Sequence, residues 1–421
     1  MEVGLLDDAN GPRGIQPRDA HEAAAGQAPQ GAHGTRQGLG RVTQVGTQPQ
    51  VCANALFGRG ALRGGTMAVM AGPLLVIFHQ PPRVGEPPLS GMLATARHAL
   101  VDHHLRLFGR AGLRRVLIVG GRDADATNRG SFGQRLAQIM EQERPRQGVI
   151  VLGGGAVPLL AQTDARRLVE AAGSRGRRAL TNNRYSSDVC AVSDAKVLRD
   201  LPPLPTDNAL PSWLEEIGGF TVRELRGRRR LALDLDTPLD LALLGRATGT
   251  PAALRRLGRM LEVPRAAAIR EMAADPRREL LVAGRTSART LRWLERHTRC
   301  RVRALVEERG MKASAASLRP PRSVLGRLLE VLGPEALASV VGELADGAII
   351  DSRVLLAHRL GADERSWPSA EDRFASDLLL ADAVVDPWLA ALTRAAAESP
   401  VPIQLGAHTL VGPGIRLLLG R

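Results

Sequence analysis

Short apolar runs alternate with amphipathic stretches along the first half of the chain. The apolar runs are residues 73–79, 114–121 and 148–155. Apolar side chains recur every three or four positions in residues 93–110, 132–142 and 163–172. Runs that are apolar throughout are typical of strands covered on both faces, and the longer period is typical of helices. The pattern predicts an α/β domain with a mostly parallel sheet.

The same alternation continues to the end of the chain. Further strands are expected at residues 188–192, 220–225, 231–236, 279–284, 301–307, 348–351 and 401–406. Further helices are expected from Pro238 to Leu244, within the Ala- and Arg-rich residues 247–278, and at residues 324–332 and 335–345. The pattern therefore predicts two α/β domains, residues 67–246 and 279–421, with a helical connector at 247–278.

Residues 1–66 differ from the rest of the chain. They show no apolar period and are rich in Gly and Gln. Such a segment cannot bury enough surface to offset the entropy lost on ordering. We expect either a disordered N-terminal extension or a start assigned too far upstream, with Met67 or Met70 as the functional beginning.

Composition narrows the class of partner. The chain has 57 Lys and Arg against 43 Asp and Glu, a formal charge of +14, but its only lysines are Lys196 and Lys312. The arginines are scattered among acids and aromatic residues make up 3%, so a nucleic-acid partner is poorly supported. Three widely separated cysteines predict a reduced, cytoplasmic protein. No apolar run reaches the roughly 18 residues that cross a bilayer, so no membrane partner is expected.

One acidic segment, residues 233–241, reads Leu-Asp-Leu-Asp-Thr-Pro-Leu-Asp-Leu. On a strand, Asp234 and Asp236 point to the same side. Two carboxylates at the carboxyl end of a strand can hold a hard cation such as Mg²⁺ against a triphosphate. Alternatively, Asp236 and Asp240 only cap the helix that begins at Pro238. Both interpretations stay open.

A polar loop follows residue 181. Its Asn, Ser and Asp residues are turn formers, so an ordinary hydrogen-bonded turn is one interpretation. Its place after a strand, at the mouth of the sheet, favours binding of a polar acceptor. The acceptor-binding candidates are Asn182, Asn183, Tyr185, Ser186, Ser187 and Asp188.

Three segments together resemble the small nucleotidyltransferases of the MobA-like group, which includes molybdenum-cofactor guanylyltransferase and 2-phospho-L-lactate guanylyltransferase. Residues 233–241 are similar to that group's closing D-[IV]-D-T-P-x-D-L segment, residues 149–160 to its strand ending in x-D-x-P-L-L, and residues 182–188 to its substrate-facing loop. The resemblance covers about residues 72–246. It implies a Rossmann-like, glycosyltransferase-A type fold. It also implies an enzyme that joins a nucleoside triphosphate to a small phosphorylated or cofactor-type acceptor and releases pyrophosphate.

Under this resemblance, Asp234 and Asp236 would hold Mg²⁺. The phosphate-binding candidates are Arg83, Gly153, Gly154 and Gly155. The three glycines are equally consistent with a tight turn between strand and helix. The chain departs from the group at two places, because Ala156 replaces its metal-binding Asp and Arg83 is the only basic residue where the group has a Gly-rich loop. The alternative is therefore a catalytically silent nucleotide- or ligand-binding protein.

The second domain resembles no family that we recognise. Asp351 ends an expected strand, and His408 follows another. Carboxylates and imidazoles can bind a metal or transfer protons, although each is also common in salt bridges. A third possibility places any chemistry in this domain, with Asp351, His358 and His408 as candidates.

Overall fold

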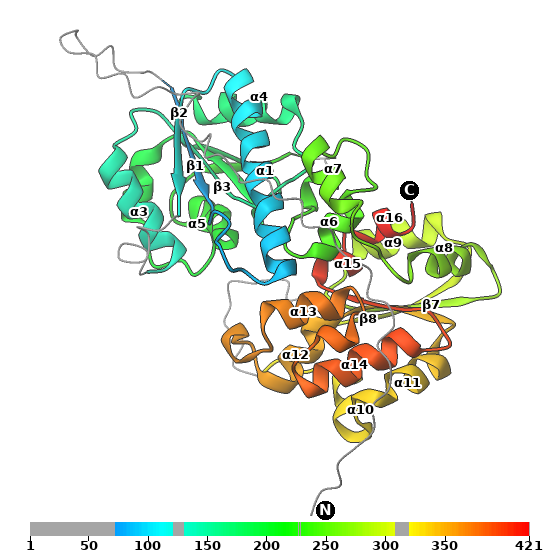
Figure 1. Ribbon diagram of the computed structural model, residues 1–421. Coiled ribbons are helices and arrows are strands. Elements are labelled where there is room, and N and C mark those ends of the chain that lie inside the picture. Colours follow the sequence, from blue (N-terminus) through cyan, green and yellow to red (C-terminus); the bar gives the residue numbers. More distant parts are fainter. Residues whose placement is uncertain (1–71, 121–129, 226, 228, 308–319, 421) are drawn as a thin grey trace, which may run out of the picture. The chain divides into compact units, whose positions relative to one another are not determined.

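The structure is a computed structural model that describes residues 72–120, 130–225, 227, 229–307 and 320–420 (Figure 1). Ala68–Arg421 form one unit, which contains a six-stranded and a four-stranded sheet. The expectation for residues 1–66 lies outside the described residues. The domain boundaries at 246 and 278 stay predictions.

Six strands form the sheet of the first region. They are β1 (Leu74–Phe78), β2 (Arg115–Val119), β3 (Val149–Gly153), β4 (Arg178–Thr181), β5 (Val189–Val192) and β6 (Thr221–Glu224). Their order is β2-β1-β3-β5-β4-β6. Only β5 is reversed, being antiparallel to both β3 and β4. The short loop at residues 182–188 explains this, since parallel neighbours need a longer crossover.

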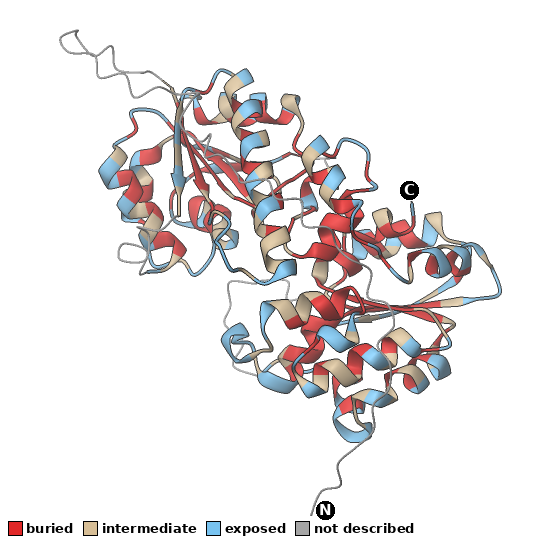
Figure 2. Ribbon diagram, viewed as in Figure 1, coloured by how far each residue is buried: buried red, intermediate tan, exposed pale blue. Residues whose placement is uncertain are grey.

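Helices cover both faces of this sheet. Leu74 and Val76 belong to one buried cluster, and Leu75 and Ile77 belong to another. Alternate side chains of a strand point to opposite faces, so β1 contributes to two separate cores. Figure 2 shows this strand as buried. The helices that contribute are α1 (Pro88–Arg110), α3 (Phe132–Glu143), α4 (Gln162–Ala172) and α5 (Leu210–Glu216). The predicted α/β class is confirmed.

The predicted strand at residues 231–236 is wrong. Arg229–Ala232 form the 3₁₀ turn η3, and the residues up to 236 are irregular. The N–H of Leu235 donates to the Gly155 carbonyl at 2.9 Å, while the Leu235 carbonyl accepts from Arg97 Nε at 2.8 Å. The Arg97 side chain thus takes the Leu235 carbonyl, to which a neighbouring strand would otherwise donate a hydrogen bond. The segment makes one backbone hydrogen bond, to the residue Gly155 just after β3, and does not pair as a strand.

The second region is built on a parallel sheet with the order β10-β9-β7-β8. Its strands are β7 (Glu279–Gly284), β8 (Arg301–Val306), β9 (Gly347–Asp351) and β10 (Ile403–Gly406). Its helices are α9 (Ala288–His297), α10 (Val324–Leu332), α11 (Leu337–Leu344), α12 (Ser352–Leu360), α13 (Ala370–Asp377), α14 (Pro387–Glu398), α15 (His408–Val411) and α16 (Ile415–Leu418). All four strands match sequence predictions.

Three helices lie between the two sheets in the chain. They are α6 (Pro238–Leu244), α7 (Ala252–Gly258) and α8 (Ala266–Ala274), so the predicted helical character of residues 247–278 is confirmed. Every residue of α6 is buried. One apolar cluster includes Leu239 of α6, Leu280 of β7 and Leu410 of α15. The residues around α6 therefore pack against elements of both regions.

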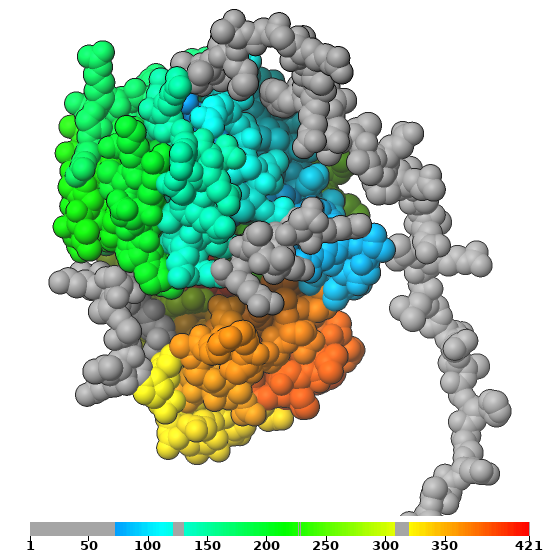
Figure 3. Space-filling view, turned by 90° about the vertical axis from the view of Figure 1, so that its left-hand side faces the viewer, coloured from blue at the N-terminus to red at the C-terminus, as the bar shows by residue number. Residues whose placement is uncertain are grey.

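A polar contact also joins the two regions. Glu371 of α13 accepts hydrogen bonds from the N–H groups of Leu89 and Ser90 at 2.8 and 2.9 Å. Those N–H groups open α1 and have no partner within the helix. Figure 3 shows the blue start of α1 directly beside the orange segment that contains α13. Glu371 therefore caps a helix of the first region.

Among the described residues, no helix combines the length and the apolar character needed to cross a membrane.

Candidate functional site

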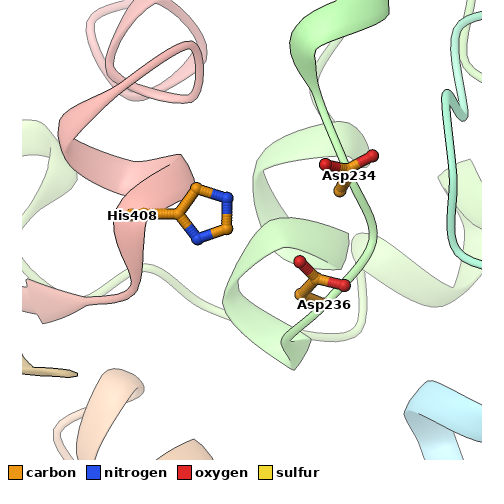
Figure 4. A group of neighbouring side chains, drawn as sticks. All are labelled: Asp234, Asp236 and His408. Atoms are coloured by element: carbon orange, nitrogen blue, oxygen red, sulfur yellow. The ribbon is translucent and has the colours of Figure 1, made fainter. Parts of the chain in front are cut away.

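Two carboxylates and an imidazole meet beside the start of α6. Asp234, Asp236 and His408 each offer a ligand atom, and these atoms all lie within 4.8 Å of one another. Figure 4 shows the two carboxylates and the imidazole turned toward a common space. The acids come from the segment after η3, and the histidine is the first residue of α15. This group could hold a divalent cation.

The carboxylate of Asp236 does not cap helix α6. Thr237 and Asp240 form the capping box of α6, in which Asp240 Oδ2 accepts from the N–H of Thr237 at 2.8 Å. Asp236 instead pairs with Arg97 of α1 at 3.2 Å. The capping interpretation therefore holds for Asp240 and does not hold for Asp236.

The end of β10 brings His408 to this place. Gly406 lies so close to α6 that a Cβ there would be 2.8 Å from Leu239 and 2.6 Å from Leu410. Only glycine allows such an approach without repacking. The tight contact explains how a residue that follows a strand of the second sheet reaches acids of the first region.

Two further acids surround the pair. Burial raises the pKa of Asp188 to about 7, and the carboxylates of Asp207 and Asp236 add to the shift. Burial, followed by the charges of Asp188 and Asp236, raises the pKa of Asp234 well above its usual range. Asp234 Oδ1 is buried and has no hydrogen-bond partner among the described residues. A divalent cation would relieve this repulsion and would satisfy the unpaired oxygen.

The polar loop is organised by its own side chains. Asn182 donates to Asp188 at 2.5 Å and to the Leu231 carbonyl at 2.8 Å, and its Oδ1 accepts from the N–H of Asp188 at 3.0 Å. Ser187 is buried and bonds to Thr181 at 2.9 Å. These residues thus act as a turn that fixes Asp188, whichever molecule the loop binds.

The remaining loop candidates are more open. Tyr185 is 63% exposed, and Ser186 donates to Asn208 at 3.1 Å. Asn182, Asn183, Ser186 and Asp188 all line the cleft described below. Acceptor binding by this loop stays a prediction.

The candidate phosphate-binding residues make contacts of their own within the first region. Arg83 is exposed and donates to Gln80 at 3.0 Å. Gly154 donates its N–H to the Phe78 carbonyl at 2.8 Å, and a Cβ there would lie 2.6 Å from His79. Gly155 accepts from Leu235. The contacts of Gly154 and Gly155 fit the tight-turn interpretation, and a phosphate-binding role for Arg83, Gly153, Gly154 and Gly155 stays a prediction.

Ala156 follows these glycines and is buried in the core of the first region. It contributes packing where the MobA-like group has a carboxylate.

The candidates of the second region do not form one group. Asp351 is buried, and its carboxylate accepts hydrogen bonds from Nε and Nη2 of Arg285 at 2.7 and 3.1 Å. His358 is buried, and its Nδ1 accepts from the N–H of Ser323 at 3.1 Å. Asp351 and His358 are thus held by neighbouring residues, whereas His408 lies with Asp234. Any chemical role for Asp351, His358 and His408 stays a prediction.

A cleft of about 530 Å³ connects the acids with the second region. Asp188 and Asp234 line it from one side, and Arg285, Arg289 and His408 line it from the other. Sequence reasoning missed Arg97, Asp207 and Arg289, since nothing in their local pattern distinguishes them from other helix and loop residues. The cleft combines a possible cation site with donors for phosphate oxygens.

Comparison with protein-family models finds no match, and comparison with curated proteins finds none either.

Proposed function

We propose that this chain is a divalent-cation-dependent nucleotidyltransferase that joins a nucleoside triphosphate to a small acceptor and releases pyrophosphate. The observation that carries the proposal is the group Asp234, Asp236 and His408 in a cleft that arginines also line. The resemblance of residues 72–246 to the MobA-like group agrees with it.

The donor set fits a divalent cation, Mg²⁺ or Mn²⁺. Carboxylate oxygens suit both ions, and an imidazole shifts the preference toward softer cations than Mg²⁺. The unpartnered Oδ1 of Asp234 is the kind of buried atom that a bound ion satisfies. Such an ion neutralises charge on the transferring phosphoryl group.

The side chains in and beside the cleft have different roles in this reaction. Asp234 and Asp236 hold the cation, Arg289 faces the phosphates from the wall of the cleft, and the loop at residues 182–188 positions the acceptor. The acceptor oxygen forms a bond to the α-phosphorus, and the bond from that phosphorus to the pyrophosphate oxygen breaks. Asp188 takes the proton that the acceptor loses, since it lines the same cleft.

The test is the double variant Asp234→Asn/Asp236→Asn, assayed for pyrophosphate release from the four nucleoside triphosphates with Mg²⁺ or Mn²⁺. Because a bound metal contributes several kcal/mol to such chemistry, we expect release to fall by about a hundredfold or more. Stability without metal should stay level or rise, since two repelling charges are removed. Asp382→Asn, at an acid whose side chain is 92% exposed, is the matched control.

The alternative, a silent ligand-binding protein, has its own signature. The parent chain would then bind a nucleotide, as judged by a rise in melting temperature, without releasing pyrophosphate over long incubation. Equal release by the parent and the double Asn variant would remove the metal site from the mechanism.

A further inference from the structure

A second pocket of about 330 Å³ opens beside the cation cleft. It is lined by five arginines, which are Arg229, Arg289, Arg292, Arg296 and Arg416. Three of these, Arg229, Arg289 and Arg416, also line the cleft that contains Asp234 and His408. The two hollows therefore adjoin each other and share a wall of arginines. We call the second hollow the arginine pocket.

Helix α9 supplies one wall of the arginine pocket. Arg289, Arg292 and Arg296 are spaced three and four residues apart, so their side chains project from one face of the helix. Trp293 lies on the same helix and is buried, and His297 stacks on it with ring centroids 4.7 Å apart. The Arg416 guanidinium lies over the Trp293 ring, 5.2 Å from its centroid. These packed rings fix the wall against which Arg416 lies.

The charges of this pocket are uncompensated. In the part of the chain that the structure describes, none of its five arginines forms an ion pair with a carboxylate. Burial lowers the pKa of Arg416, and the charges of Arg229 and Arg289 lower it further. By contrast, Arg285 in the neighbouring cleft is paired with Asp351. Unpaired like charges held together cost stability, and a bound anion would relieve that cost.

We infer that the arginine pocket binds a pyrophosphate or phosphate-ester group of the substrate, and that the second region, which supplies four of its five arginines, thereby contributes phosphate recognition to the cleft. Guanidinium groups bind phosphate oxygens through paired N–H donors. The pocket has the size of a small-molecule subsite. Its one tryptophan is buried against His297 and Arg416, so that the Trp293 ring is not available for stacking bases of a nucleic acid. The identity of the substrate rests on the proposed function, whereas the anion site itself does not.

The test uses inorganic pyrophosphate as the probe, titrated calorimetrically into the full chain without divalent cations. The double variant Arg289→Gln/Arg292→Gln should bind it about a hundredfold more weakly than the parent, because each charge-assisted bond contributes about a tenfold factor. Arg299→Gln, at an exposed arginine outside the pocket, is the matched control and should bind as the parent does. Because Arg289 and Arg292 are exposed, the double variant should melt no lower than the parent.

Two further comparisons make failure of this inference distinguishable from failure of the proposed function. Asp234→Asn/Asp236→Asn should keep pyrophosphate binding without metal, even if no nucleotidyl transfer is ever detected. No binding by the parent at millimolar pyrophosphate, or equal binding by the parent and the double Arg variant, would overturn the inference. Single-stranded RNA that loses affinity in the double Arg variant, while pyrophosphate does not, would overturn it in favour of a nucleic-acid surface.

Discussion

The acids that line the cleft come from the first region, and most of its arginines come from the second. The first region contributes Asp188, Asp234 and one arginine, Arg229, whereas the second contributes Arg285, Arg289 and Arg416 together with His408. Neither set is complete by itself, because a cation site needs carboxylates and a phosphate site needs positive charge. The function that we propose for this chain therefore depends on both sheets being present.

The arginines of the second region also divide into two kinds. Arg353 is buried and bonds both oxygens of buried Asp377, at 2.6 and 2.7 Å. Arg289 and Arg292 are exposed and have no carboxylate partner among the described residues. A paired, buried arginine stabilises the fold, while unpaired arginines around a pocket cost stability and are available for a ligand.

The largest effect that we expect comes from removing a buried, paired arginine of the second region. Arg353→Met should lower the free energy of unfolding by about 3–5 kcal/mol, because it leaves Asp377 buried without its partner. Urea denaturation followed by circular dichroism measures this loss. Arg365→Met, which breaks an exposed pair with Asp363, is the control and should leave the free energy of unfolding almost unchanged. Similar losses in both variants would contradict the distinction between the two kinds of arginine.

A smaller effect tests whether His408 truly joins the acids of the other region. His408→Gln should weaken Mn²⁺ binding by about tenfold or more, since one of three ligands loses its imidazole nitrogen. Mg²⁺ binding should fall less, because Mg²⁺ prefers oxygen ligands. Calorimetric titration of each ion into parent and variant gives both values. Unchanged affinity for both ions would leave the Asp pair as the whole site.

The smallest effect concerns acid sensitivity in the first region. Burial, and then the charge of His103, lowers the pKa of His104 to about 3. As the pH falls below about 6.5, His104 becomes protonated in the unfolded chain while it stays neutral in the folded protein. The folded state therefore loses stability as the pH falls from about 6.5 toward the folded pKa of about 3. Between pH 7.5 and 5.5 the parent should lose about 1.4 kcal/mol more unfolding free energy than His104→Leu.

Urea denaturation of both chains at the two pH values gives this difference, in which titrations common to parent and variant cancel. A difference near zero would mean that His104 is protonated at the same pH in the folded and unfolded states.

Local signals in the sequence predicted much of the fold. Helix α6 begins at Pro238 after Thr237, as its capping pattern indicates, and the strands of the second sheet are marked by apolar runs. β4 was missed because its four residues, Arg178–Thr181, include only two apolar ones. The strand expected at residues 231–236 failed because Arg97, from a distant helix, occupies the carbonyl of Leu235.

The candidate site was predicted only in part. Asp234 and Asp236 were found from their spacing, and His408 was found as a separate candidate. Their meeting depends on the packing of Gly406 against Leu239, a tertiary contact that no periodicity encodes. For Asp351 the sequence left a salt bridge open, and the structure pairs it with Arg285.

The most direct test of the central claim is a titration of the metal-free chain with Mn²⁺, followed by electron paramagnetic resonance of the free ion. We expect the parent to bind a single equivalent at the group Asp234, Asp236 and His408, and Arg289→Gln/Arg292→Gln to bind it equally well. Asp234→Asn/Asp236→Asn should bind none over the same range. Absence of binding by the parent, or equal binding by the double Asn variant, would contradict the claim that this group is a cation site.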